Sequence, residues 1–236
     1  MISVCMTTYN GEAFLAQQLD SILPQLQADD EVLISDDGST DQTPAILAQY
    51  AQQDERIRLL AGPRQGVIRN VESVLRQARG RYLFLADQDD IWLPNRCADM
   101  LAVFHAHPDV QLVLADLAVI DVQGQLVAPS YFALRRVRPG FWPNVLRSGY
   151  IGAGMAITAE LQAEALPFPA QLPMHDMWLG ALAGKHVALL PTVLTHYRRH
   201  TQNVSEIATT SSIWRKLTWR VQLLYAVALR KTMKNK

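Results

Sequence analysis

The sequence predicts an α/β fold with a single, mostly parallel β-sheet flanked by helices. Through the first hundred residues, short apolar runs alternate with segments of helical periodicity, and the turns between them are short. Clusters of polar residues follow the apolar runs, and parallel sheets bind ligands beyond the carboxyl ends of their strands. The chain has 236 residues, 49% of them hydrophobic, which is enough for one packed domain with a small appendage.

The first half is predicted to alternate strictly between strands and helices. Pro24 ends the first helix and Pro44 starts the second, because proline lacks the N–H that a helix interior needs. Gly80 ends the third helix, directly before the fourth strand. The predicted strands are 2–7, 31–35, 57–60 and 82–86, and the predicted helices are 14–23, 44–53 and 67–78.

The second half is less regular. Residues 123–145 contain three prolines and are expected to form a loop or lid. A strand is expected over 151–157, where Gly152 and Gly154 would let the backbone approach another group closely. The remaining predictions are strands at 110–118 and 187–190, helices at 175–183 and 212–231, and a basic loop at 195–203.

Charge is unevenly distributed although the formal net charge is zero. The chain after Glu206 holds seven basic residues and no acid, which leaves 15 basic and 22 acidic residues before it. That acidic excess disfavours nucleic-acid binding by the main body. We therefore expect a main domain over 1–205, with halves 1–100 and 101–205, and a basic amphipathic helical tail over 206–236.

The tail has two interpretations. Its basic residues lie away from one apolar face, so the helix could rest on the anionic inner face of a membrane and bring the site to a lipid-linked acceptor. It could instead pack that apolar face on the main domain or on a partner subunit. The residues of the face are Trp214, Leu217, Val221, Leu224, Tyr225 and Ala228.

Cysteine usage and the N-terminus predict an intracellular protein. Cys5 and Cys97 show no metal-binding spacing, which suits a reduced compartment. Met1 is followed at once by strand-like residues, so we expect no signal peptide. No apolar run approaches the ~20 residues of a membrane span. The expected location is the cytoplasm, with peripheral attachment to the inner membrane face if the tail binds lipid.

An acidic cluster follows the fourth predicted strand. Asp87, Asp89 and Asp90 fall within four positions, and carboxylates so close repel one another unless a cation lies among them. Oxygen ligands suit Mg²⁺ or Mn²⁺, which commonly bridge a pyrophosphate. The alternative is an acidic turn that caps the next helix through Asp90 or Asn95.

Two further clusters follow the first two strands. Residues 36–41 include three aspartates, and an aspartate there could accept hydrogen bonds from a nucleobase imide or a ribose hydroxyl. Residues 7–10 would complete the pocket, with Tyr9 packing on the base. Taken alone, residues 36–41 would sooner indicate a turn with a helix cap, and the functional interpretation depends on the joint placement of the two clusters.

Four motifs in order make the sequence resemble the inverting family 2 glycosyltransferases over roughly residues 2–205. They are TTYN at 7–10, SDDGSTD at 35–41, DQDDIW at 87–92 and HDMW at 175–178. The resemblance implies a Rossmann-like nucleotide-sugar domain of the glycosyltransferase A type, with an acceptor half behind it. Residues 82–94, 175–178 and 197–203 look most like bacterial rhamnosyltransferases of surface-polysaccharide assembly.

The resemblance also implies roles for single residues. The donor would be a nucleoside diphosphate sugar, with dTDP or UDP as the nucleotide. The acceptor would be a saccharide or a lipid-linked saccharide. Asp176 would be the base that takes the proton of the acceptor hydroxyl, and at a helix N-terminus it is expected to stay ionised. Asp89 would be the main metal ligand, with Asp90 supporting it. The nucleobase of the donor would be held by Thr7, Tyr9 and Asp37, and its ribose or phosphate by Asp87.

Other residues have an alternative beside each functional interpretation. Arg198 and His200 could contact the diphosphate or lie in a surface loop. Arg69 and Asn70 could face the nucleotide, although Arg69 could equally be a solvated helix residue. The remaining residues, with a role in acceptor binding or in packing, are Gly152, Gly154 and Trp178.

Two other function classes need the same kind of fold. A sugar-phosphate nucleotidylyltransferase would carry a glycine-rich, basic loop after the first strand, where this chain has residues 8–12, TYNGE. A non-catalytic nucleotide-sugar binding module would not need all the carboxylates that this chain retains.

Overall fold

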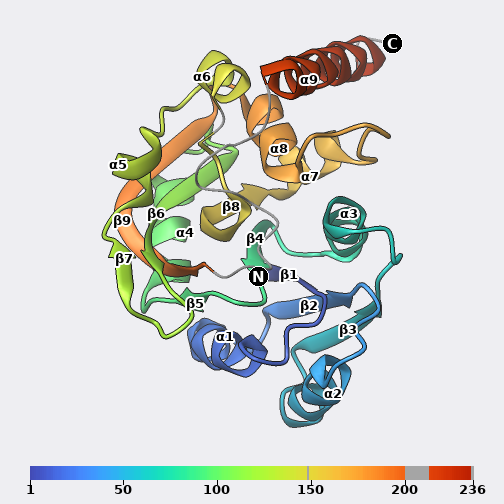
Figure 1. Ribbon diagram of the computed structural model, residues 1–236, viewed down its shortest axis with the longest axis vertical. Helices are drawn as coiled ribbons and strands as arrows, with labels where there is room; N and C mark the ends of the chain where they lie inside the picture. Colours follow the sequence, from blue (N-terminus) through green and yellow to red (C-terminus); the bar gives the residue numbers. More distant parts are fainter. Residues whose placement is uncertain (148, 200–212, 235–236) are drawn as a thin grey trace.

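The computed structural model describes residues 1–147, 149–199 and 213–234 and shows an α/β fold in three layers (Figure 1). Within these residues the central sheet has nine strands, in the order β3-β2-β1-β4-β8-β6-β9-β5, with β7 paired to β6. The mostly parallel, Rossmann-like sheet that the sequence predicts is thus present, with antiparallel strands added in its second half.

The first half follows the predicted alternation closely. Its four strands are parallel neighbours, and the register sets Thr8 beside Asp36 and Thr7 beside Asp87. The polar residues at the strand ends therefore lie along one edge of the sheet. The elements are β1 (Ile2–Thr8), α1 (Leu15–Ile22), η1 (Leu23–Gln25), β2 (Glu31–Asp36), α2 (Thr43–Gln53), β3 (Ile57–Ala61), α3 (Val67–Gln77) and β4 (Tyr82–Asp87).

The second half adds strands of both directions. β8 runs antiparallel between β4 and β6, and β9 runs parallel to β6 and antiparallel to β5. The elements are β5 (Ile91–Trp92), α4 (Arg96–Ala106), β6 (Leu112–Ile120), β7 (Leu126–Ala128), α5 (Tyr131–Arg135), α6 (Phe141–Leu146), η2 (Gly152–Gly154), β8 (Met155–Thr158), α7 (Ala159–Ala165), α8 (His175–Ala183), β9 (Val187–Arg198) and α9 (Ile213–Lys234).

Residues 151–154, predicted as the start of a strand, are not strand, and Gly152–Gly154 form the short helix η2. The prediction is also wrong for two segments that were expected to be loops. Residues 123–145 are not one loop but contain β7, α5 and α6, because buried Asp116 holds the segment by accepting hydrogen bonds from Ser130 Oγ and from the N–H of Phe132 at 2.9 Å. Residues 195–198 are not a loop but the end of β9, which pairs with β6 over its whole length. In both cases distant residues supply the partners, which local sequence does not show.

Helices cover both faces of the sheet. One core cluster includes apolar residues of α1, α2 and α4, and the other includes residues of α3 and α5 to α9. Strands buried on both faces explain the continuous apolar runs of the sequence. Among the described helices, none combines the length and apolar character that a membrane crossing requires.

Helix α9 packs on the body through a face other than the predicted one. Leu223, Ala226 and Val227 are buried in the same core cluster as α8, while Val221 and Tyr225 of the predicted apolar face are exposed. Polar contacts hold the helix in place: Arg230 donates to backbone oxygens of Glu164 at 2.8 Å, Leu166 at 2.7 Å and Pro167. The side chain of Trp214 lies outside the described residues.

Candidate active site

One cleft of about 820 Å³ opens at the carboxyl ends of the first-half strands and reaches the N-terminus of α8. Residues predicted from four separate motifs line it together. They are Thr7, Tyr9, Asp37, Asp87, Asp89 and Asp176. Gly152 and Asn70 also line the cleft.

The β1 end of the cleft is held by a side chain of the acidic motif. The Gln88 amide accepts a hydrogen bond from the N–H of Tyr9 at 2.9 Å and donates to the carbonyl of Tyr9 at 3.0 Å. This paired contact fixes the backbone of Tyr9 and leaves its ring 58% exposed at the cleft. A flat exposed aromatic ring is suited to stacking on a planar ligand group.

Asp37 organises the loop that follows β3. Its two carboxylate oxygens accept the N–H groups of Arg64 at 2.6 Å and Gly66 at 2.7 Å. A carboxylate oxygen has two lone pairs, so each still has capacity for a ligand hydrogen bond. Gly38, beside it, has φ +93° and lies under the Arg64 side chain, and a Cβ there would come within 2.8 Å of Arg64 Nε.

Arg64 was not predicted to be a site residue. The sequence pointed instead to Arg69 as the arginine that faces the nucleotide. Arg64 lines the cleft, and its guanidinium has no hydrogen-bond partner within the described part of the chain. Arg69 instead bonds Glu72 and the backbone oxygens of Phe168 and Pro169, outside the cleft. The two arginines lie five positions apart, and only the path of the loop after β3 distinguishes them.

The acidic motif lies at the floor of the cleft. Burial and the neighbouring carboxylates Asp89 and Asp176 raise the pKa of Asp87 to about 7. Burial likewise raises the pKa of Asp90 above its usual range, and its Oδ2 has no partner within the described residues. Such mutual repulsion is relieved by a cation.

Within the described residues, no three His, Cys, Asp or Glu side chains already surround a metal position. Mg²⁺ and Mn²⁺ are commonly held by one or two carboxylates together with substrate phosphates. Asp89 and Asp87, both on the cleft, fit that pattern. Asp90 fits a supporting role, since it is 1% exposed and lies behind them.

Two buried arginines support this acidic loop from behind. One of them is Arg198. Its backbone N–H donates to Asp90 Oδ1 at 3.0 Å, and its side-chain Nε donates to the carbonyl of Asp89 at 3.0 Å. At 3% exposure it does not open onto the cleft, so the predicted diphosphate contact is replaced by a structural one. His200 lies outside the described residues.

Arg96 is the second buried arginine, and the sequence analysis did not identify it. It is fully buried, bonds Thr195, and lies 4.4 Å from the centre of the Trp92 ring. Burial lowers its pKa to about 10, so it remains a cation at neutral pH and partly offsets the charge of Asp87 and Asp90.

The N-terminus of α8 supplies the far wall of the cleft. Burial raises the pKa of Asp176 to about 7, although the N–H groups of Met177 and of Asp176 itself oppose the shift. The expectation that this carboxyl is fully ionised at neutral pH therefore needs correction, because desolvation outweighs the helix N-terminus. Burial lowers the pKa of adjacent His175 to about 4, so that its imidazole is neutral.

Two predicted acceptor contacts lie in the core. The Trp178 indole is fully buried and donates to the carbonyl of Ala165 at 3.1 Å, so no ring face is left for a sugar. Gly154 packs against β6, where a Cβ would come within 2.7 Å of the carbonyl oxygen of Ala115. Packing between helices accounts for Trp178, and close packing against the sheet accounts for Gly154.

Known proteins resemble this chain in sequence. Residues 3–155 match the family described as glycosyl transferase family 2. The Escherichia coli protein WfgD, named a UDP-Glc:alpha-D-GlcNAc-diphosphoundecaprenol beta-1,3-glucosyltransferase, is 23% identical over 87% of this chain and 79% of its own length. The uncharacterized Mycobacterium tuberculosis protein Rv1520 is 28% identical over 86% of this chain, which spans 60% of the length of that relative.

Solved structures show the same fold. TarS residues 1–349 from S. aureus, in complex with UDP-GlcNAc, superposes with a TM-score of 0.71 at 18% identity, covering 97% of this chain and 69% of TarS 1–349. The mannosyltransferase PcManGT from Pyrobaculum calidifontis, in complex with GDP-Man and Mn²⁺, gives a TM-score of 0.63 at 21% identity over 98% of this chain and 64% of its own. On the family match, which spans more than half of its residues, the chain belongs to glycosyl transferase family 2.

Proposed function

We propose that this chain is an inverting glycosyltransferase that moves a sugar from a nucleoside diphosphate sugar to a hydroxyl of a saccharide or lipid-linked saccharide. The observation that carries the proposal is the convergence of Asp37, Asp89 and Asp176, from three distant motifs, on one cleft. Membership of family 2 and the nucleotide sugars bound by TarS and PcManGT support it.

The first half holds the donor. Tyr9 stacks on the nucleobase, while Thr7, Asp37 and Arg64 border it, and Asp87 faces the ribose or the phosphates. Asp89, assisted by Asp87, would hold Mg²⁺ or Mn²⁺, and the bound ion would supply positive charge to the departing nucleoside diphosphate. A cation beside the leaving group lowers the barrier because charge develops there in the transition state.

The second half performs the proton transfer. Asp176 accepts the proton of the acceptor hydroxyl as that oxygen bonds to the anomeric carbon and the bond from carbon to the diphosphate oxygen breaks. Attack from the face opposite the leaving group inverts the anomeric configuration. A pKa of about 7 gives this base a strong affinity for the proton while leaving a substantial ionised fraction at neutral pH.

The donor sugar is part of the proposal. The resemblance to rhamnosyltransferases supports dTDP-rhamnose, whereas the name of WfgD supports UDP-glucose and the complex of TarS with UDP-GlcNAc supports UDP-N-acetylglucosamine. The acceptor of WfgD is carried on diphosphoundecaprenol, which supports a lipid-linked acceptor, bacterial surface-polysaccharide synthesis and a location at the cytoplasmic membrane face.

A donor screen followed by product analysis tests the proposal. Thermal unfolding is measured with dTDP-rhamnose, UDP-glucose, UDP-N-acetylglucosamine and GDP-mannose, each with and without Mn²⁺. At a concentration 100 times the dissociation constant, a true donor stabilises the fold by about 2.7 kcal/mol. The stabilising donor is then incubated with saccharide acceptors. Release of nucleoside diphosphate supports the proposal, whereas release of pyrophosphate would identify a nucleotidylyltransferase.

A further inference from the structure

Half of the basic residues lie in two segments that contain no acid. Residues 131–147 carry four arginines, and residues 207–236 carry seven basic residues, so these segments hold 11 of the 22 lysines and arginines. The rest of the chain carries all 22 acidic residues. Such segregation creates a strong local field that attracts an anionic partner.

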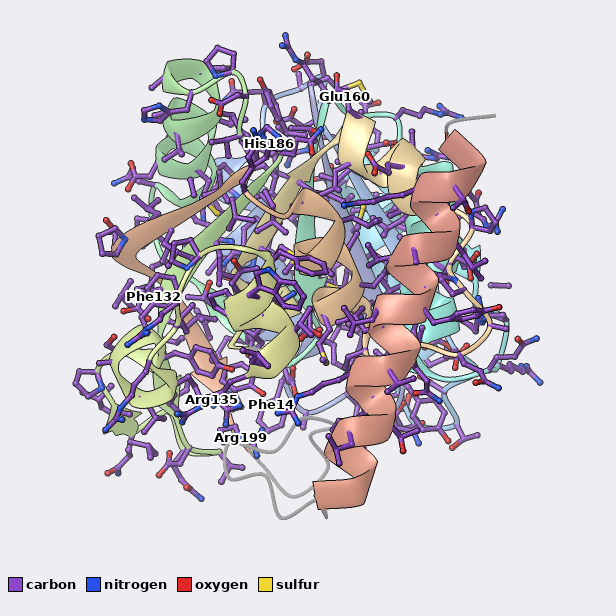
Figure 2. The ribbon with its side chains drawn as sticks, turned by 90° about the horizontal axis from the view of Figure 1, so that it is seen from above. Phe14, Phe132, Arg135, Glu160, His186 and Arg199 are labelled. Carbon is purple, nitrogen blue, oxygen red and sulfur yellow. The ribbon has the colours of Figure 1, made fainter. Side chains whose placement is uncertain are left out.

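The fold brings the two segments together. Helix α6 of the first segment packs beside α9 of the second on one face of the molecule, which Figure 2 views from above. The Arg220 guanidinium donates to the carbonyl of Leu146, and Lys231 Nζ lies 5.9 Å from the centre of the Phe141 ring. The described parts of the two basic segments, α6 and α9, therefore form one surface.

Large apolar side chains stand exposed on this surface. Trp142 is 62% exposed and Leu146 is 59% exposed on α6, and Val221 and Tyr225 on α9 are 65% and 66% exposed. Arg138 and Arg147, on either side of α6, are also exposed. We refer to these six residues as the α6–α9 surface.

We propose that the α6–α9 surface docks on an anionic lipid bilayer. Exposed aromatic and aliphatic side chains beside arginines suit the interface between headgroups and acyl chains. The absence of acid from both segments favours anionic headgroups, since each basic residue near such a surface adds electrostatic attraction. A second copy docked symmetrically would set basic residues against basic residues, which disfavours a dimer through this face.

The surface borders the half of the cleft assigned to the acceptor. Asn144, between Trp142 and Leu146 on α6, donates from its side-chain amide to the carbonyl of Met177, the residue after Asp176 in α8, at 3.1 Å. A docked molecule would thus meet a lipid-linked acceptor close to Asp176. This consequence rests on the proposed function, whereas bilayer binding itself does not, and binding is measured without substrate.

Sedimentation of the full chain with vesicles tests the proposal. Vesicles of phosphatidylcholine with phosphatidylglycerol are compared with vesicles of phosphatidylcholine alone. Arg147→Glu is paired with the control Lys185→Glu, an equal charge change at an exposed residue outside this surface. The double variant Trp142→Ser with Tyr225→Ser is paired with Leu126→Ser with Val127→Ser, which lie exposed on β7.

Wild type and both controls should bind the anionic vesicles, and binding should weaken on neutral vesicles and in high salt. We expect Arg147→Glu to reduce partitioning at least about fivefold, the effect of losing one basic residue, and the aromatic double variant at least about tenfold. Equal binding by each variant and its control, or no preference for anionic vesicles, would overturn the proposal. So would a dimer that dissociates in the aromatic variant without any vesicle binding. Unchanged unfolding temperatures verify that the variants are folded.

Discussion

The two halves of this molecule differ in how closely their cleft residues follow from the local sequence. In the first half, the functional residues of three motifs lie at or just beyond the end of the strand that positions them: Tyr9 follows β1, Asp37 follows β2, and Asp89 lies two positions after β4. In the second half, Asp176 begins a helix that is reached through irregular chain, and its neighbour in the cleft, Tyr197, lies 21 positions later in β9. Local sequence therefore indicates which first-half residues reach the cleft more directly than it does for the second half.

The strongest test of this division replaces Asp176. Asp176→Asn keeps the size of the side chain but removes its ability to accept a proton, so kcat should fall by about 10²–10⁴-fold. Donor affinity, which depends on the first half, should stay within about twofold by calorimetry, because no donor contact is removed. Wild-type turnover by Asp176→Asn would break the assignment of the two halves.

For Asp89, in contrast, we expect donor binding to weaken. Asp89→Ala should weaken Mn²⁺-dependent donor binding roughly 100-fold, because it removes a carboxylate from beside the cation and diphosphate. Exposed Glu55→Ala changes the charge equally at a distance and serves as the control in the same titration. If Mn²⁺ strengthened donor binding equally in both variants, the metal would have to lie elsewhere.

The pH dependence of kcat/KM tests the role of Asp176 as the base. Since the pKa of Asp176 is raised to about 7, its ionised fraction, and with it kcat/KM, should fall about tenfold per pH unit below that value and level off above it. The raised pKa also means that the folded chain retains a proton which the unfolded chain loses near pH 4. This carboxyl therefore lowers folding stability as pH rises from roughly 4 to 7.

Comparison with Asp176→Asn isolates this carboxyl. The variant should lose that part of the slope of unfolding free energy against pH, measured by urea unfolding at several pH values. An activity plateau extending unchanged to pH 5 would show that no group with a pKa near 7 limits the reaction.

The smallest expected effect separates two arginines of the donor side. Arg64→Ala should weaken donor binding about tenfold through loss of a charged hydrogen bond, with no change in unfolding temperature. Arg69→Ala should instead cost about 1–3 kcal/mol of stability, since Glu72 and two backbone carbonyls lose their partner, and should leave donor affinity unchanged. Calorimetry and thermal unfolding of both variants would reveal an exchange of these roles.

The sequence alone determined the alternation of the first half and the position of its acidic and aromatic motifs. Strand and helix periodicity is a local property, and in a parallel sheet the strand ends meet along one edge whatever surrounds them. The same reasoning separated a basic tail from an acidic body, because charge is counted along the chain.

Tertiary structure decided which side chains reach the cleft. Arg64 and Arg69 are chemically equal, and the hydrogen bonds that the loop after β3 donates to Asp37 bring the first to the ligand side. Trp178 is buried by contacts with α7 and α9 that its own motif does not contain. Distant residues likewise decide which face of α9 is buried and how far the pKa of Asp176 is raised. Burial and desolvation are properties of the packed molecule and not of a local stretch of chain.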